Sequence, residues 1–196
     1  GRAIARLPRL GGARNEVERI ASLIPASDVL LGADASEQQL AALADEDALR
    51  RYQVLHLATH AIVDGRSPER SSLVLSQVGL PDPLESVLSG ERVYDGLLSM
   101  SEIVRGWKLD AELVTLSACD TALGHEVGGE GYIGLAHAFF RAGATNLLVS
   151  LWEVDDEATS LLMQRFYENW LGAYEDVRAE LTGQRMSKSE ALKEAK

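Results

Sequence analysis

The chain has 196 residues, of which 46% are hydrophobic and 25% charged, and its formal net charge at pH 7 is −11. This length and balance are typical of one soluble domain with a sizeable core, and the acidity argues against a nucleic-acid-binding surface, which needs clustered Lys and Arg. A single cysteine excludes an internal disulfide and a multi-cysteine zinc site, and no apolar run is long enough to span a bilayer. We therefore expect no nucleic-acid or membrane partner, and a cytoplasmic location.

Helix-like and strand-like segments alternate along the chain. In chain order the patterns predict a helix over 17–24, a strand over 28–31, a helix over 36–49, strands over 52–58 and 72–76, a helix over 100–107, a strand over 112–118, a helix over 132–141, a strand over 146–152 and a helix over 155–170. Capping-box patterns that begin at Ser36 and Ser99 mark two of the helix starts. The alternation and the continuous apolar strands predict an α/β fold with a mostly parallel central sheet flanked by helices.

Two loops interrupt this alternation. Residues 77–95 form a long stretch with Pro81, Pro83, Gly79 and Gly90, and a segment of this length is usually functional or disordered. The second loop, 124–131, is rich in glycine. The chain begins with Gly rather than Met, and residues 187–196 look like a helix cut short. We expect residues 1–196 to be a single domain of a larger parent protein.

Two reactive side chains follow buried strands. His60 comes after the strand at 54–58 and Cys119 after the strand at 113–118. In a parallel sheet the working site lies beyond the carboxyl ends of the strands, so neighbouring strands would bring the two together. An imidazole can take the thiol proton and later protonate the leaving amine of a peptide, while the N–H groups of Cys119 and Ala61 are candidates for an oxyanion hole. By position alone, an inert buried cysteine and a structural histidine are equally good interpretations.

Other chemistries fit the sequence less well. Residues 129–134 match the dinucleotide pattern G-x-G-x-x-G, but ten residues separate the preceding strand from Gly129, whereas the pattern should follow a strand directly. His56 and His60 lie on one strand about 13 Å apart at 3.3 Å per residue, too far to share a metal ion. No cofactor and no metal site is therefore predicted.

The motifs around both residues resemble one family. The segments VLHLATHA (54–61) and LSACDTALG (116–124) look like the His and Cys motifs of CHAT domains, caspase-like peptidases often attached to tetratricopeptide repeats, and the likeness extends to 128–131 and 150–159. The resemblance implies a caspase-like three-layer sandwich and a catalytic dyad of His60 and Cys119. One departure is Ala61, where the family usually has Gly.

The resemblance also implies a function. It suggests a cysteine endopeptidase that cleaves a specific protein partner in a regulated bacterial signalling or defence system, under regulatory domains or repeats of the parent chain. By similarity to separases, Asp155, Asp156 and, more weakly, Glu153 would bind a basic substrate residue, although the two aspartates are equally suited to begin a helix. Asp120 is a further candidate for contacting substrate. The alternative function is a catalytically silent caspase-like scaffold that transmits a signal.

Overall fold

The computed structural model describes residues 7, 10–64, 67–120, 130–150, 156–173 and 185–196. Its contacts divide the chain into two compact units. Unit 1 comprises Gly1–Pro8 and Leu30–Glu153, and unit 2 comprises Arg9–Val29 and Val154–Lys196. Each unit is described by itself below.

Unit 1 is built on a five-stranded sheet with the strand order β3-β2-β1-β4-β5. The strands are β1 (Val54–Ile62), β2 (Ser72–Val74), β3 (Leu97–Ser99), β4 (Leu113–Asp120) and β5 (Leu147–Val149). β1, β4 and β5 run parallel, whereas β2 and β3 pair antiparallel at one edge. The predicted α/β class with a central sheet is confirmed.

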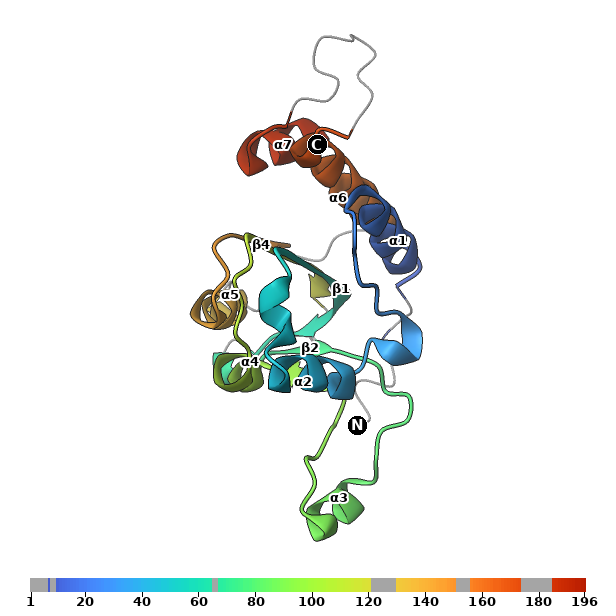
Figure 1. Ribbon diagram of the computed structural model, residues 1–196, viewed down its shortest axis with the longest axis vertical. Helices are drawn as coiled ribbons and strands as arrows, with labels where there is room; N and C mark the ends of the chain where they lie inside the picture. The colour runs from blue at the N-terminus through green and yellow to red at the C-terminus, as the bar shows by residue number, and fades with distance from the viewer. Residues whose placement is uncertain (1–6, 8–9, 65–66, 121–129, 151–155, 174–184) are drawn as a thin grey trace. The chain divides into compact units, whose positions relative to one another are not determined.

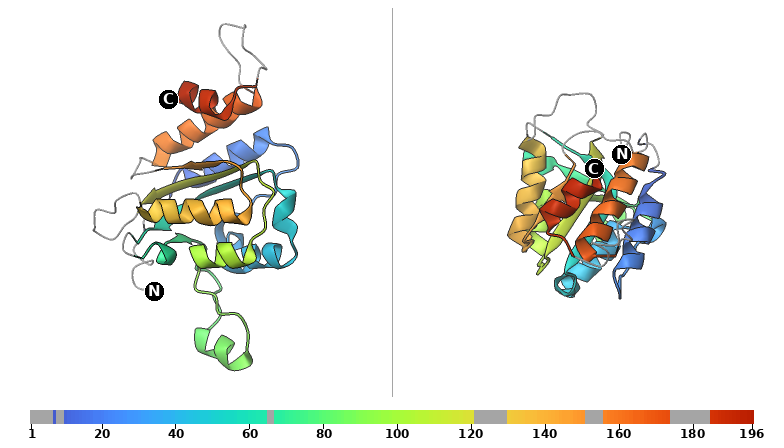
Figure 2. Two further views of the ribbon diagram at one scale, coloured as in Figure 1. Left: turned by 90° about the vertical axis from the view of Figure 1, so that its left-hand side faces the viewer. Right: turned by 90° about the horizontal axis from the view of Figure 1, so that it is seen from above.

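The helices in the described part of unit 1, except α3, pack their apolar faces on this sheet. The described helices of unit 1 are α2 (Glu37–Asp45), α3 (Pro83–Ser89), α4 (Met100–Gly106) and α5 (Glu130–Ala142), with short 3-10 segments at Gly32–Asp34, Ala48–Arg51 and Pro68–Arg70. Ile103 of α4 and Phe139 of α5 are fully buried in one core with Leu73 and Leu116 of the sheet. Trp107 meets Phe139 edge-on at 5.9 Å between ring centroids. Figures 1 and 2 show α4 and α5 side by side against the sheet, with α3 standing away from it.

The described part of unit 2 contains three helices, two of which pack against the longest. α6 (Asp156–Leu171) packs against both α1 (Ala13–Leu23) and α7 (Lys188–Ala195). Phe166 and Tyr167 are buried on α6, and Asn169 donates a hydrogen bond from Nδ2 to the Ala191 carbonyl on α7 at 3.3 Å. Ser187 and Glu190 form a capping box that begins α7. No helix in the described part of the chain is both long and apolar enough to cross a bilayer.

Some predicted elements differ from the structure. Residues 28–31 do not form a strand; Val29 is partly exposed and no neighbouring strand pairs with this segment among the described residues. The helix predicted over 36–49 ends at Asp45, because Asp47 takes a left-handed conformation (φ 54°) before a 3-10 turn. The stretch 77–95, predicted as a loop, contains α3, and the short β3 beyond it was not predicted.

Candidate active site

The two candidate catalytic residues occupy paired positions on neighbouring strands. β1 and β4 run parallel in register over eight positions, from Val54 opposite Leu113 to Ala61 opposite Asp120, and His60 pairs with Cys119. Adjacent strands lie about 4.8 Å apart, so the two backbones are direct neighbours at this level. The prediction that His60 follows its strand is wrong in detail, because β1 continues to Ile62; β4 likewise includes Cys119.

The register also separates two faces of the β1–β4 pair. Successive residues of a strand point to opposite faces. The positions of Leu57, Ala61 and Leu116 belong to the core under α4 and α5. The alternate positions are largely polar: His56 pairs with Thr115, Ala58 with Ser117, and His60 with Cys119.

Burial on this polar face is high. The His60 side chain is 8% exposed, and Thr115 and Ser117 are also buried. The sequence analysis did not single out Thr115. The signal that marks Thr115 and Ser117 is their position four and two residues before Cys119, on a strand whose other face is apolar.

The far end of β1 is fixed by polar contacts to the antiparallel edge. The Thr59 hydroxyl, next to His60, donates a hydrogen bond to the Val74 carbonyl on β2. After β1, the Asp64 N–H donates to the Ser71 hydroxyl at 3.1 Å, and the Asp64 carboxylate accepts from the Ser67 N–H at 3.0 Å. These contacts hold the backbone on either side of Ala61, which is buried and lies opposite both Asp120 and Leu73.

Several predicted site residues lie outside what the structure describes. Glu153 and Asp155 fall in the undescribed stretch 151–155, and the glycine-rich loop falls largely in 121–129. Asp156 is the first residue of α6, which agrees with the helix-start interpretation of its sequence position. Cys119 and Asp120 are placed by their backbone in β4.

The first glycine of the G-x-G-x-x-G match, Gly129, lies outside the described residues. Gly131 and Gly134 lie inside α5, which begins at Glu130. The dinucleotide pattern instead needs its first glycine in the turn between a strand and a helix. β4 ends at Asp120, well before α5 begins.

A cavity of about 350 Å³ lies beside β3 and the start of α4. Glu37 of α2, only 4% exposed, is one of its lining residues and accepts hydrogen bonds from the N–H groups of Asp95 (2.9 Å) and Gly96 (2.8 Å). Burial, together with the neighbouring Glu102 carboxyl, raises the pKa of Glu37 to about 7, against the effect of these two hydrogen bonds.

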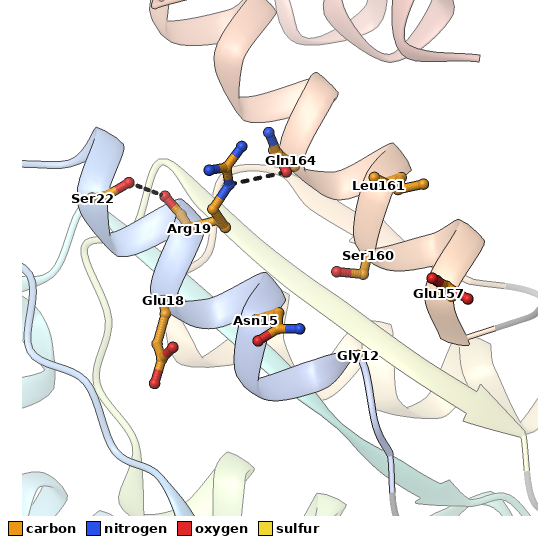
Figure 3. A pocket seen from close by; sticks show the side chains of 9 residues that line it. All are labelled: Gly12, Asn15, Glu18, Arg19, Ser22, Glu157, Ser160, Leu161 and Gln164. Atoms are coloured by element: carbon orange, nitrogen blue, oxygen red, sulfur yellow. Dashed lines mark hydrogen bonds between the residues drawn. The ribbon is translucent and has the colours of Figure 1, made fainter.

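A groove of about 600 Å³ belongs to unit 2. It lies between α1 and α6, as Figure 3 shows, with Arg19, Glu157 and Gln164 among its lining residues. Arg19 donates from Nε to the Gln164 side-chain oxygen at 3.2 Å. Its mixed charged and polar lining suits contact with a polar chain segment better than an apolar ligand.

Comparison with known proteins decides the family. The family model described as CHAT domain matches residues 3–196, which is nearly the whole chain. The chain belongs to the CHAT domain family. It is also similar to human tetratricopeptide repeat protein 28, with 29% identity over 143 residues that cover 63% of this chain. The match spans only 6% of that relative's length.

CHAT domains are a family of caspase-like peptidases, and the resemblance predicted from the motifs at 54–61 and 116–124 is confirmed at the level of the family. The mixed α/β sheet of unit 1 is consistent with the caspase-like sandwich that this family implies.

Proposed function

We propose that this CHAT domain is a cysteine endopeptidase in which His60 and Cys119 form the catalytic dyad. The observation that carries the proposal is the strand register, which pairs position 60 with position 119 on adjacent parallel strands. Paired positions of parallel neighbours belong to the same face of a sheet. A base and a nucleophile so placed are within reach of one substrate carbonyl.

In the proposed reaction, His60 accepts the proton of the Cys119 thiol, and the thiolate attacks the carbonyl carbon of the scissile peptide bond. The carbonyl oxygen becomes an oxyanion, for which we propose the backbone N–H groups of Cys119 and Ala61 as donors. The imidazolium of His60 then protonates the leaving amine, and water hydrolyses the thioester with His60 again as base. Among the described residues, Ala61 is not one of those with a positive φ, so alanine is tolerated there without backbone strain.

The dyad is tested with a peptide acyloxymethyl ketone, a probe that alkylates a catalytic thiolate. We expect wild type to be labelled and Cys119→Ala to be silent. His60→Gln should lower the labelling rate by about 10²–10⁴-fold, the usual contribution of a general base. His56→Gln is the matched control: it changes a second histidine of β1, four residues earlier, and should leave the rate within about twofold of wild type by the same reasoning.

The same experiment distinguishes the proposed peptidase from the alternative function. Labelling that His60→Gln and His56→Gln reduce equally would contradict the dyad. A wild-type protein that is folded but never labelled would instead support the catalytically silent scaffold, which acts by binding a partner.

We further propose that the peptidase cleaves after a basic residue of a protein substrate, with Asp155 and Asp156, assisted by Glu153, binding the Arg or Lys side chain. A desolvated carboxylate pair favours guanidinium and ammonium groups through charge-assisted hydrogen bonds. Asp120, which follows Cys119, is proposed to contact the substrate backbone. The support for these roles is the family motif over 150–159.

A peptide panel that varies only the residue before the scissile bond tests this preference. We expect kcat/KM for Arg or Lys to exceed that for Glu by at least about tenfold, and the ratio to fall in Asp155→Asn and Asp156→Asn. Glu157→Gln, which removes an exposed carboxylate one residue further along α6, is the control and should keep the ratio. Equal turnover of basic and acidic peptides would rule the preference out.

For the biological setting we propose a regulated bacterial signalling or defence system in the cytoplasm. The support is the family membership, and the printed name of the human relative, tetratricopeptide repeat protein 28, supports repeats in the parent chain. Regulatory domains or repeats in the parent chain would then control the peptidase.

A further inference from the structure

A protruding arm is the most unusual surface of unit 1. We define the arm as residues 77–96, which leave the sheet after β2 and return to it at β3, with α3 at the tip. Its base is closed: the Gln77 amide donates to the Gly96 carbonyl at 3.0 Å, and Glu37 accepts from the Asp95 and Gly96 N–H groups. In Figure 1 and in the left view of Figure 2, α3 stands clear of the other helices of unit 1. The arm is therefore an extension of unit 1 whose base is held in place by hydrogen bonds.

The tip presents an unpartnered apolar face. Leu84, Val87 and Leu88 follow the i, i+3, i+4 spacing of one helical face, and all three are exposed, Leu88 by 80%. The helix is defined at both ends, because Asp82 caps it through the Leu84 and Glu85 N–H groups and Gly90 ends it in the left-handed region. Clustered apolar side chains on such a presented helix are typical of a docking element.

Charge restricts what this face can bind. Asp82, Glu85 and Glu91 surround the apolar side chains, while the nearby cation, Arg92, is already paired with Asp45 at 3.3 Å. The tip is thus apolar with a negative rim. A complementary surface must be apolar with a positive rim.

The chain itself carries such a surface on α5. The outward stripe of this helix consists of Ile133 (54% exposed), His137, Phe140 (48% exposed) and Arg141, at i, i+4, i+7 and i+8. The opposite face of α5 is buried in the core through Phe139 and its neighbours. Two exposed apolar side chains are therefore flanked by an arginine and a histidine.

We propose that the α3 face of one copy of this chain docks on the α5 stripe of a second copy. Charge complementarity selects this pairing. If α3 packed on α3, Glu85 of one copy would lie near Glu85 of the other, and if α5 packed on α5, the two Arg141 side chains would lie near each other, so both arrangements are repulsive. Within one copy the two surfaces lie apart, as Figures 1 and 2 show. The inference does not depend on the proposed peptidase chemistry.

This contact is heterologous, because two different surfaces of the same chain meet. Each copy that uses its arm keeps a vacant α5 stripe, so association continues beyond a dimer or closes into a ring. The faces are small compared with the roughly 1,200–2,000 Å² buried in stable complexes, so the association is weak and concentration-dependent.

Sedimentation velocity of the 196-residue chain from about 5 to 500 μM, in reductant and about 0.15 M salt, tests the proposal. We expect wild type to associate as concentration rises. Leu88→Asp on α3 and Phe140→Asp on α5 should each lower the association constant by at least about tenfold, since each places a charge in the apolar contact. Leu161→Asp, a change at an exposed leucine of α6 (60% exposed, against 80% for Leu88), is the control and should associate like wild type.

A mixing experiment decides the arrangement. The Leu88→Asp chain keeps an intact α5 stripe and the Phe140→Asp chain keeps an intact arm, so an equimolar mixture should form one-to-one dimers although each chain alone is monomeric. Glu85→Lys should weaken association, and Arg141→Glu in the same chain should restore it. A wild-type chain that remains monomeric at 500 μM, a mixture that fails to pair, or an equal loss in Leu161→Asp would overturn the proposal.

Discussion

At the scale of single residues, Gly143 has a backbone position that only glycine fits. It follows α5 with φ of 116°, and a Cβ there would lie 2.9 Å from the carbonyl carbon of Leu109 and closer still to its oxygen. We expect Gly143→Ala to lower the free energy of unfolding by roughly 2–4 kcal/mol, because left-handed strain and overpacking add together. Urea unfolding followed by circular dichroism measures the loss.

Gly106 provides the control for this substitution. It is the last residue of α4, its φ is not positive, and a Cβ would meet nothing within 4 Å. Gly106→Ala should change the free energy of unfolding by less than about 1 kcal/mol, with stabilisation expected from the better helix propensity of alanine. Equal losses at the two positions would show that the Leu109 contact does not restrict Gly143.

The residues of the candidate site could be predicted from the sequence to different degrees. His60 and Cys119 could be singled out because their chemistry is specific and each belongs to a recognisable motif. Their pairing could only be assumed, since it depends on which strands are neighbours and on the register between them. Both are non-local properties that a single strand does not encode.

At the scale of elements, long segments were predicted better than short ones. The helices α1, α5 and α6 and the strands β1 and β4 each carry enough periodic apolar residues to be recognised. β3 has only three residues, and its formation depends on pairing with β2. The extension of β1 to Ile62 has the same origin, because β2 pairs with Ala61 and Ile62.

The arm shows a local signal that the sequence prediction did not use. Proline and glycine suggested a loop over 77–95, yet Asp82 followed by Pro83 is a helix start and Gly90 is a helix stop. The same residues that break longer elements therefore delimit a seven-residue helix. The apolar face of α3 is exposed and does not join the core of unit 1, so the helix cannot be recognised by a face that it buries.

At the scale of the whole molecule, the chain forms two units that are not continuous in sequence. Unit 2 joins residues 9–29 with 154–196 through the packing of α1 on α6. No local pattern signals that these distant segments belong together, although each helix was predicted. Unit 2 is defined only by the contact between its two segments, 9–29 and 154–196, which are distant in the sequence.

The titration of Glu37 should contribute to the pH dependence of the free energy of unfolding. Its pKa is raised from 4.5 to about 7 in the folded chain, so the folded state holds this proton more tightly than the unfolded state. The stability that it contributes is complete below pH 4.5 and is lost as pH rises to about 7, by roughly 2–3 kcal/mol.

Glu37→Gln keeps an acceptor oxygen for the Asp95 and Gly96 N–H groups but cannot titrate. In urea unfolding between pH 4.5 and 8, wild type should therefore lose stability relative to Glu37→Gln as pH rises, whereas Glu85→Gln, which removes one exposed charge from α3, should follow wild type. Parallel curves for wild type and Glu37→Gln would mean that folding leaves the pKa of Glu37 unchanged, because its two N–H bonds offset burial and the Glu102 charge.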